Sequence, residues 1–301
     1  MIFYKELRGI DDVLEWVKRR PRAEPRIYEM PGDTEIVVIV PTAGHEGIYA
    51  RNIKEIFRGL HIIFVESSGP YFSYSYSCNY GFKYALKMYK PRWYILSNDD
   101  MMMGDPPDKL KQELSTINDK NIATVFTHPP GVYHSYPVYL VKFKELYGIL
   151  YSMYIGVACR CVVPNFYRKF RIKYGLGAFV KGSFFDKIRS IIALSNISVK
   201  KIKKYLITGS FSIFSHYFVE KYNGEIFDTS YLMSREDFDL SIRIFEEEER
   251  YDFINYSIKD MIGGTLGKGP LRSLKSLIDD ITLNYKITNK ILKISHEKFY
   301  Q

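Results

Sequence analysis

The sequence has few cysteines and no long apolar run. Three cysteines occur among 301 residues, and the close pair Cys159 and Cys161 has no second pair or nearby histidine at zinc-ligand spacing. Stretches without acidic residues, lysine or arginine, such as 146–159 and 205–219, are shorter than the roughly 20 residues of a membrane-spanning helix. The first 20 residues are charged throughout and lack the apolar core of a secretion signal. We therefore expect a reduced, cytoplasmic setting and no transmembrane helix.

The composition is that of a folded globular protein, with 46% hydrophobic and 26% charged residues. The formal net charge is +9, but it is concentrated in one segment. Residues 151–205 hold 12 lysines and arginines against one acidic residue, Asp186, so the other residues sum to −2. The chain is therefore a near-neutral body with a basic module, and each needs its own explanation.

The basic module is also rich in tyrosine and phenylalanine. Cations mixed with aromatic rings suit the surface of an anionic membrane, where each cation contributes about 1 kcal/mol. A solvated basic face with a few core aromatics explains the same composition equally well. Single-stranded nucleic acid is the least favoured partner, although base stacking and phosphate contacts would use the same residue types.

Short apolar runs alternate with helical periodicity, which predicts an α/β fold with a doubly wound, mostly parallel sheet and flanking helices. Strands are expected at 35–40, 61–65, 93–96, 121–126 and 207–214, and a periodic helix at 236–249. We divide the chain into an N-terminal helix and connector (1–33), a first α/β half (34–145), a basic aromatic-rich insertion (146–205), a second half (206–265) and a C-terminal helical tail (266–301).

Three of the expected strands end in polar loops, at residues 41–47, 66–69 and 97–100. In a doubly wound sheet, ligands bind in the crevice beyond the carboxyl ends of the strands. We therefore expect these three loops to meet in one crevice.

Two acidic clusters could carry chemistry. Asn98, Asp99 and Asp100 directly follow a buried strand, where carboxylates can hold a divalent cation that bridges a diphosphate. A turn or helix cap explains these three residues equally well. Glu236 and Asp237 open a packed helix, where a carboxylate could accept a proton from an attacking hydroxyl. The alternative for this pair is stabilisation by the helix dipole, worth about 0.3 to 1 kcal/mol.

Taken in order along the chain, these motifs resemble those of a family 2 glycosyltransferase with the GT-A fold. The resemblance rests on four stretches: VVIVPTAG (37–44), HIIFVESSG (61–69), YSCNYGFKYALK with WYILSNDDM (76–101) and TGSFSIFSHYFVEKYNGEIFDTSYLMSREDFDLSIR (208–243). Their order makes them specific, because each fragment alone is weak. The chain departs from the family pattern in having one more residue between Gly224 and Phe227.

The resemblance implies that the first half binds a nucleoside diphosphate sugar. The donor-binding residues would be Pro41, Thr42, Glu66, Asn98, Asp99 and Gly209. Glu66 stands where the family usually has aspartate, and Asn98 is the first residue at the family's Asp-x-Asp position. Gly209 would let the backbone approach the donor sugar because it has no side chain, although relief of crowding within the sheet is the structural alternative.

The resemblance also implies a divalent cation, Mg²⁺ or Mn²⁺. Asp100 would be its main ligand. The family often has a histidine before a glycine-rich segment near the end of the catalytic domain, and this chain has Asp260 there instead. Asp260 could replace the histidine as an oxygen ligand.

The second half would carry the catalytic and acceptor residues. Asp237 matches the acid that acts as general base in inverting members, and Glu236 matches its neighbour at the acceptor site. The implied reaction is transfer of a hexose-like sugar to an acceptor hydroxyl with inversion at the anomeric carbon. The acceptor would be a glycan or a lipid-linked molecule, presented at the inner membrane face if the basic module docks there.

Two alternatives remain open at this point. A sugar nucleotidyltransferase would keep the fold but needs a glycine-rich, basic loop after the first strand, and PTAGHEG lacks the basic residues. A non-enzymatic protein that binds membranes or nucleic acid on a degenerate transferase fold would explain the departures at Asn98 and Asp260.

Overall fold

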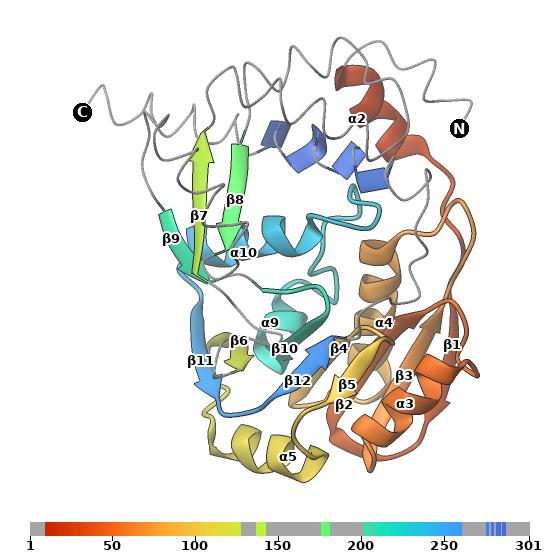
Figure 1. Cartoon of the computed structure of the whole chain (residues 1–301), viewed down its shortest axis with the longest axis vertical. Coiled ribbons are helices and arrows are strands. Elements are labelled where there is room, and N and C mark those ends of the chain that lie inside the picture. The colour runs from red at the N-terminus through yellow and green to blue at the C-terminus, as the bar shows by residue number, and fades with distance from the viewer. Residues whose placement is uncertain are drawn as a thin grey trace.

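A computed structural model describes residues 10–127, 137–142, 176–180, 202–205 and 207–260, together with residues 275, 276, 278, 279, 281–283, 285 and 286 (Figure 1). The helices in this part are α2 (Ile10–Arg19), α3 (Ile48–Ile56), α4 (Tyr74–Met88), α5 (Pro107–Thr116), α9 (His216–Lys221) and α10 (Glu236–Glu246). The strands of the main sheet are β1 (Arg26–Met30), β2 (Asp33–Thr42), β3 (Leu60–Glu66), β4 (Trp93–Ser97), β6 (Ile122–Thr127), β10 (Phe211–Ser215) and β11 (Arg250–Ile254).

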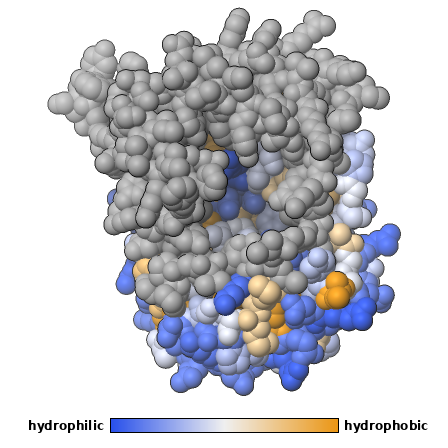
Figure 2. Space-filling view, in the orientation of Figure 1, coloured by the Kyte–Doolittle hydropathy of each residue, from blue (hydrophilic) through white to orange (hydrophobic). Residues whose placement is uncertain are grey.

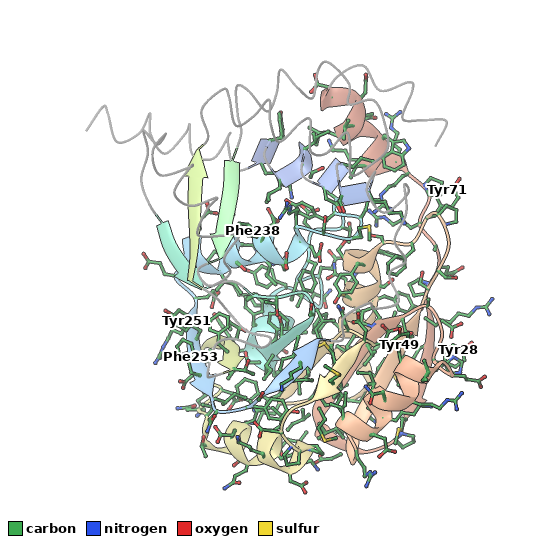
Figure 3. All side chains as sticks on the ribbon, viewed as in Figure 1. Tyr28, Tyr49, Tyr71, Phe238, Tyr251 and Phe253 are labelled. Atoms are coloured by element: carbon green, nitrogen blue, oxygen red, sulfur yellow. The ribbon has the colours of Figure 1, made fainter. Side chains whose placement is uncertain are left out.

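The main sheet has seven strands in the order β1-β3-β2-β4-β10-β6-β11. The pairs β2–β3, β2–β4 and β6–β11 are parallel, whereas β1 and β10 run antiparallel to their neighbours. Five strands therefore point the same way, which confirms the predicted mostly parallel α/β sheet. Figure 3 shows Tyr28 at the β1 edge and Tyr251 and Phe253 at the β11 edge.

Helices cover both faces of this sheet, because the central strands are apolar on both sides. Val38 and Val40 of β2 pack on the face that α3 covers, and Val37 and Ile39 pack on the face that α4 covers. Helix α4 lies very close to the sheet at Gly81, where an added Cβ would come within 2.5 Å of the Ile39 Cγ2 atom. Glycine at this position therefore allows the helix to approach the sheet.

Two smaller sheets accompany the main one. Strand β5 (Met101–Met103) pairs antiparallel with β12 (Ile258–Asp260), in a register that sets Asp260 opposite Met101. The other sheet has the order β8-β7-β9, with β7 (Pro137–Lys142), β8 (Leu176–Val180) and β9 (Ile202–Tyr205). Strands β8 and β9 fall inside the predicted insertion, and the rest of that insertion lies outside the described residues.

Three details of the predicted elements are wrong. The connector expected within residues 1–33 contains strand β1, an edge strand paired with β3. Its residues are half-buried or exposed, so the sequence shows no continuous or alternating apolar run there. The strand expected at 207–214 begins at Phe211, and the helix expected at 236–249 ends at Glu246.

The helices in the described part of the chain are short, the longest being the 15-residue α4. None of them combines the length and the apolar character needed to cross a bilayer.

Candidate active site

The three polar loops meet at the carboxyl ends of neighbouring strands. Strand β2 lies between β3 and β4, and its last residue, Thr42, is in register with Glu66 at the end of β3. The Thr42 hydroxyl donates a hydrogen bond to Asp99 Oδ2 at 2.7 Å, which ties the end of β2 to the loop after β4. Pro41 precedes Thr42 and is buried in the same strand. The loops after β2, β3 and β4 therefore lie together, and this strand end, called the crevice below, holds Pro41, Thr42, Glu66 and Asp99.

His45 contacts one oxygen of the Glu66 carboxylate through both its backbone and its ring. Glu66 Oε2 lies 2.6 Å from His45 Nδ1 and accepts the His45 backbone N–H at 3.0 Å. These hydrogen bonds lower the pKa of Glu66, so the carboxylate stays ionised. The His45 ring also stacks on Tyr28, with ring centroids 3.6 Å apart. His45 therefore braces Glu66 from the first strand-end loop, a contact that the sequence did not indicate.

Strand β10 brings the second half of the chain to the same crevice. It runs antiparallel to β4 and sets Phe211 opposite Ser97, so the turn before β10 lies beside the acidic loop after β4. The Asn98 N–H donates to the Ser210 carbonyl at 2.8 Å. The Tyr74 hydroxyl lies between the two segments, 2.9 Å from Asn98 Oδ1 and within hydrogen-bond distance of the Gly209 carbonyl.

The start of α10 faces this turn. Gly209 donates its backbone N–H to Asp237 Oδ2 at 3.2 Å. A Cβ added to Gly209 would lie 3.2 Å from Glu236 Oε1, 3.6 Å from Tyr74 Cε1 and 3.8 Å from Asp237 Oδ2. The missing side chain of Gly209 thus lets both carboxyl groups approach the backbone. Figure 2 shows hydrophilic residues in the middle of this face, at the position of the start of α10 in the matching view of Figure 1.

The two carboxyl groups of this pair have different surroundings. Glu236 is buried, and among the described residues nothing hydrogen-bonds to its Oε2 atom. Burial, followed by the charge of Asp237, holds the pKa of Glu236 well above its usual range. Burial also raises the pKa of Asp237, but the N–H groups of Gly209 and Phe238 stabilise its charged form. These N–H groups favour ionisation of Asp237 over ionisation of Glu236.

Tyr74 was not identified from the sequence, where it is one of 26 tyrosines. It is buried, and burial raises the pKa of its hydroxyl well above the usual value, so the group remains a hydrogen-bond donor. Its role follows from tertiary contacts between α4, β4 and the turn before β10, and no local pattern in the sequence reports such contacts.

The predicted metal ligands can be placed only in part. The described residues contain no group of three or more histidine, cysteine, aspartate or glutamate side chains that could hold a metal ion. Asp100 follows Asp99 in the crevice, and the backbone of Asp260 lies opposite Met101, one residue further along. Mg²⁺ commonly uses one or two protein carboxylates together with substrate phosphates. One or two carboxylates at this strand end are compatible with a cation that arrives with a phosphorylated ligand.

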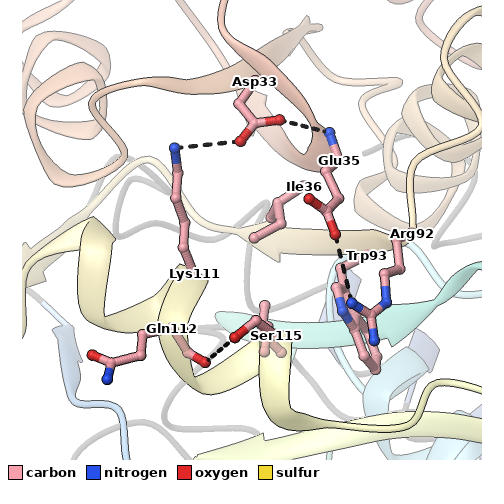
Figure 4. Close-up of a pocket in the computed structure, with 9 residues that line it drawn as sticks. Asp33, Glu35, Ile36, Arg92, Trp93, Lys111, Gln112 and Ser115 are labelled. Atoms are coloured by element: carbon pink, nitrogen blue, oxygen red, sulfur yellow. Dashed lines mark hydrogen bonds and ion pairs between the residues drawn. The ribbon is translucent and has the colours of Figure 1, made fainter.

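A pocket of about 300 Å³ lies at the opposite end of the sheet, where β2 and β4 begin (Figure 4). It is lined by Asp33, Glu35, Ile36, Arg92, Trp93, Lys111, Gln112, Leu114 and Ser115. None of the predicted site residues belongs to it. Its cations face carboxylates, with Lys111 Nζ 3.4 Å from Asp33 Oδ2 and Arg92 Nη1 3.5 Å from Glu35 Oε1.

The sequence matches no protein-family model and no curated protein. Among solved structures, the chain is similar to that of a glycosyltransferase involved in the glycosylation of the major capsid of PBCV-1, with 22% sequence identity and a TM-score of 0.25. The likeness covers 35% of this chain and 56% of that chain, so it spans little more than half of that protein. A TM-score this low supports no inference about function, which must come from the site itself.

Proposed function

We propose that this protein is a glycosyltransferase that moves a sugar from a nucleoside diphosphate sugar to an acceptor hydroxyl. One observation carries the proposal: Tyr74 and Gly209 join an acidic strand end, at Asn98, to a carboxyl pair formed by the buried Glu236 and the half-buried Asp237. Such a crevice would hold a phosphorylated sugar donor beside a carboxylate that can take up a proton. Perturbed carboxyl groups in a crevice are typical of sites that transfer protons.

Asp237 is the general base in this proposal. Its ionised carboxylate would take the proton of the acceptor hydroxyl as that oxygen attacks the anomeric carbon and the bond to the diphosphate breaks. Attack from the side opposite the diphosphate inverts the configuration of the sugar. Glu236 keeps its proton and would donate a hydrogen bond to the acceptor or the sugar, because its Oε2 is otherwise unused among the described contacts.

The donor would bind along the ends of β2, β3 and β4. Pro41, Thr42 and Glu66 are proposed to line the pocket for the base and the ribose. Asp99 lies beside this proposed pocket, because its carboxylate accepts a hydrogen bond from the Thr42 hydroxyl. A bound Mg²⁺ or Mn²⁺ would neutralise charge on the leaving diphosphate. Asp100 is the proposed protein ligand, with Asp260 as a second candidate.

The acceptor is proposed to be a glycan or a lipid-linked molecule. The basic module at residues 151–205 would favour an acceptor at an anionic membrane surface, since its twelve cations would add electrostatic attraction. Of this module, the structure describes the backbones of β8 and β9, which flank β7.

A thermal-shift screen tests the proposal. The full chain is melted with UDP-, GDP- and TDP-linked sugars, each with and without Mn²⁺. Binding to the native state alone raises the melting temperature, by an amount equivalent to about 2.7 kcal/mol at a hundredfold excess over Kd. We expect at least one donor to stabilise the protein, more strongly with Mn²⁺, and Lys111→Ala in the distant pocket to show the same shift. No shift with any donor would contradict the proposal.

A further inference from the structure

Asp279 binds three consecutive backbone amides of the loop before α10. Its Oδ1 atom accepts the Leu232 N–H at 2.7 Å, and its Oδ2 atom accepts the N–H groups of Met233 and Ser234 at 3.0 and 2.9 Å. The Ser234 hydroxyl adds a contact at 3.2 Å. Asp279 is completely buried and comes 45 residues after Ser234, so a distant helical segment holds this loop. Figure 1 shows that segment in dark blue beside α2.

The amides lie directly before a strained backbone position. Arg235 has a φ of +73°, a left-handed conformation that costs a residue with a side chain roughly 1–2 kcal/mol. The next two residues are Glu236 and Asp237, which begin α10. The strained residue thus sets the direction in which both carboxyl groups leave the backbone, and it needs support from its surroundings.

Helix α4 holds the carbonyl side of the same loop. The hydroxyls of Ser73 and Ser75 donate to the Tyr231 carbonyl at 3.1 and 2.6 Å, and the Tyr74 N–H donates to the Leu232 carbonyl at 2.8 Å. The loop is therefore fixed from two sides, its carbonyls by α4 and its amides by Asp279. The α4 side includes Tyr74, which also contacts Gly209 in the crevice.

Two buried cations accompany Asp279. Arg20 and Lys275 are both nearly inaccessible to solvent, and the charge of Asp279 stabilises the charged form of each. When Asp279 is ionised, above its pKa of about 7, its charge also interacts unfavourably with a charge on Glu236 and favours the protonated form of Glu236. Asp279 therefore acts on the carboxyl pair both through the loop and through its charge.

We propose that Asp279 is a positioning residue that holds the strained turn at Arg235 and so fixes Glu236 and Asp237 against Gly209. The inference rests on the proposed glycosyl transfer for its turnover test, whereas its hydrogen-exchange test needs no substrate. Asparagine at position 279 would keep one acceptor but set an NH₂ group against N–H donors, so the turn would be released.

The test compares Asp279→Asn with a matched control, Asp228→Asn. Asp228 accepts the Ser230 N–H at 2.7 Å in the same loop, whereas the amides of residues 232–234 donate to Asp279. With the donor that the wild type turns over, Asp279→Asn should lower kcat about 10- to 100-fold, while Asp228→Asn stays within about threefold of wild type. The basic limb of the pH–rate profile should also move to lower pH in Asp279→Asn, because Glu236 ionises more easily. A loss of folded protein would lower the rate at every pH without shifting the basic limb. A basic limb at the wild-type pH, or an equal loss of kcat in both variants, would overturn the proposal.

Hydrogen exchange gives a readout that needs no substrate. In the wild type, the amides of residues 232–234 should exchange slowly, and in Asp279→Asn at least about tenfold faster, while Asp228→Asn leaves them unchanged. Fast exchange in the wild type would overturn the proposal even if Asp279→Asn fails to fold. Slow wild-type exchange together with no turnover of any nucleotide sugar would support the role of Asp279 in the loop and contradict the proposed function.

Discussion

The two ends of the main sheet use charged residues in different ways. At the amino ends of β2 and β4, Lys111 faces Asp33 and Arg92 faces Glu35, and all four side chains are partly exposed. At the carboxyl ends, Glu236 is buried beside another carboxyl group, and its pKa is raised far above its usual range. The amino end holds a pocket whose two cations each face a carboxylate, whereas the carboxyl end places the carboxyl groups of Glu236 and Asp237 next to one another.

This difference separates charged residues that form ordinary ion pairs from the carboxyl groups to which we assign a role in the reaction. Partly exposed ion pairs contribute up to about 1 kcal/mol and are common on any surface. Burying Glu236 beside the half-buried Asp237 costs stability and is maintained by surrounding contacts, here from Gly209 and the loop that Asp279 holds. The proposed chemistry therefore belongs to the carboxyl end, although the pocket of Figure 4 lies at the other.

The largest effect is expected for Asp237→Asn. Asparagine has nearly the same shape but cannot take a proton, so transfer should fall at least about 10³-fold while the fold is retained. The measurement is the initial rate of nucleoside diphosphate release with an active donor. Asp239→Asn is the matched control, because Asp239 lies in the same helical turn and faces Lys286 at 3.6 Å instead of Gly209. Full activity of Asp237→Asn would remove Asp237 as the base.

A smaller effect is expected for Gly209→Ala. The new Cβ would press on Glu236 Oε1 at 3.2 Å, so the carboxyl pair must shift by a few tenths of an ångström. We expect about a tenfold loss of kcat with little loss of stability. The control is Gly44→Ala in the first strand-end loop, where an added Cβ meets nothing within 4 Å. Equal rates in the two variants would show that the approach of the carboxyl pair to Gly209 is unimportant.

The pH dependence of stability should also distinguish Asp279 from Asp228, because their pKa values are shifted in opposite directions. Burial raises the pKa of Asp279 from 3.8 to about 7 in the native state, so the native protein keeps a proton that the unfolded chain loses between these values. The free energy of unfolding should therefore fall as pH rises through this window, by up to about 1.4 kcal/mol per unit. Urea unfolding of Asp279→Asn between pH 4 and 7 should show a weaker fall.

Asp228 gives the opposite sign and serves as the control. Although burial alone would raise the pKa of Asp228, Lys286 and the hydrogen bonds from Ser230 lower it below its usual value. Its contribution is present above the unfolded pKa and is lost as pH falls through the folded pKa. Asp228→Asn should therefore keep the wild-type slope between pH 4 and 7, and should lose only the rise of stability with pH that Asp228 gives below the unfolded pKa of 3.8. The same slope in both variants would contradict these assignments.

The smallest effect is expected at the amino end. Lys111→Ala removes a partly exposed ion pair with Asp33 and should change the free energy of unfolding by less than about 1 kcal/mol. Donor turnover should equal that of the wild type. A large loss of turnover would mean that the amino-end pocket takes part in the reaction.

The central strands could be predicted from the sequence because β2, β3 and β4 are continuous apolar runs. Strand β1 could not, since its residues are half-exposed, and β5 and β12 have three residues each. Residue type alone pointed to Asp99, Glu236 and Asp237 as candidates. Tyr74 and Asp279 were missed because their importance comes from contacts across 135 and 47 residues of sequence, which no local pattern encodes.

Release of a nucleoside diphosphate is the most direct test of the carboxyl-end site. The wild type, Asp237→Asn and Lys111→Ala are each incubated with UDP-, GDP- and TDP-sugars in the presence of Mg²⁺ or Mn²⁺, and the released diphosphate is measured. We predict that at least one donor is consumed by the wild type and by Lys111→Ala at the same rate, and at a rate at least about 10³-fold lower by Asp237→Asn. Consumption of no donor, or equal consumption by Asp237→Asn, would contradict the proposed function.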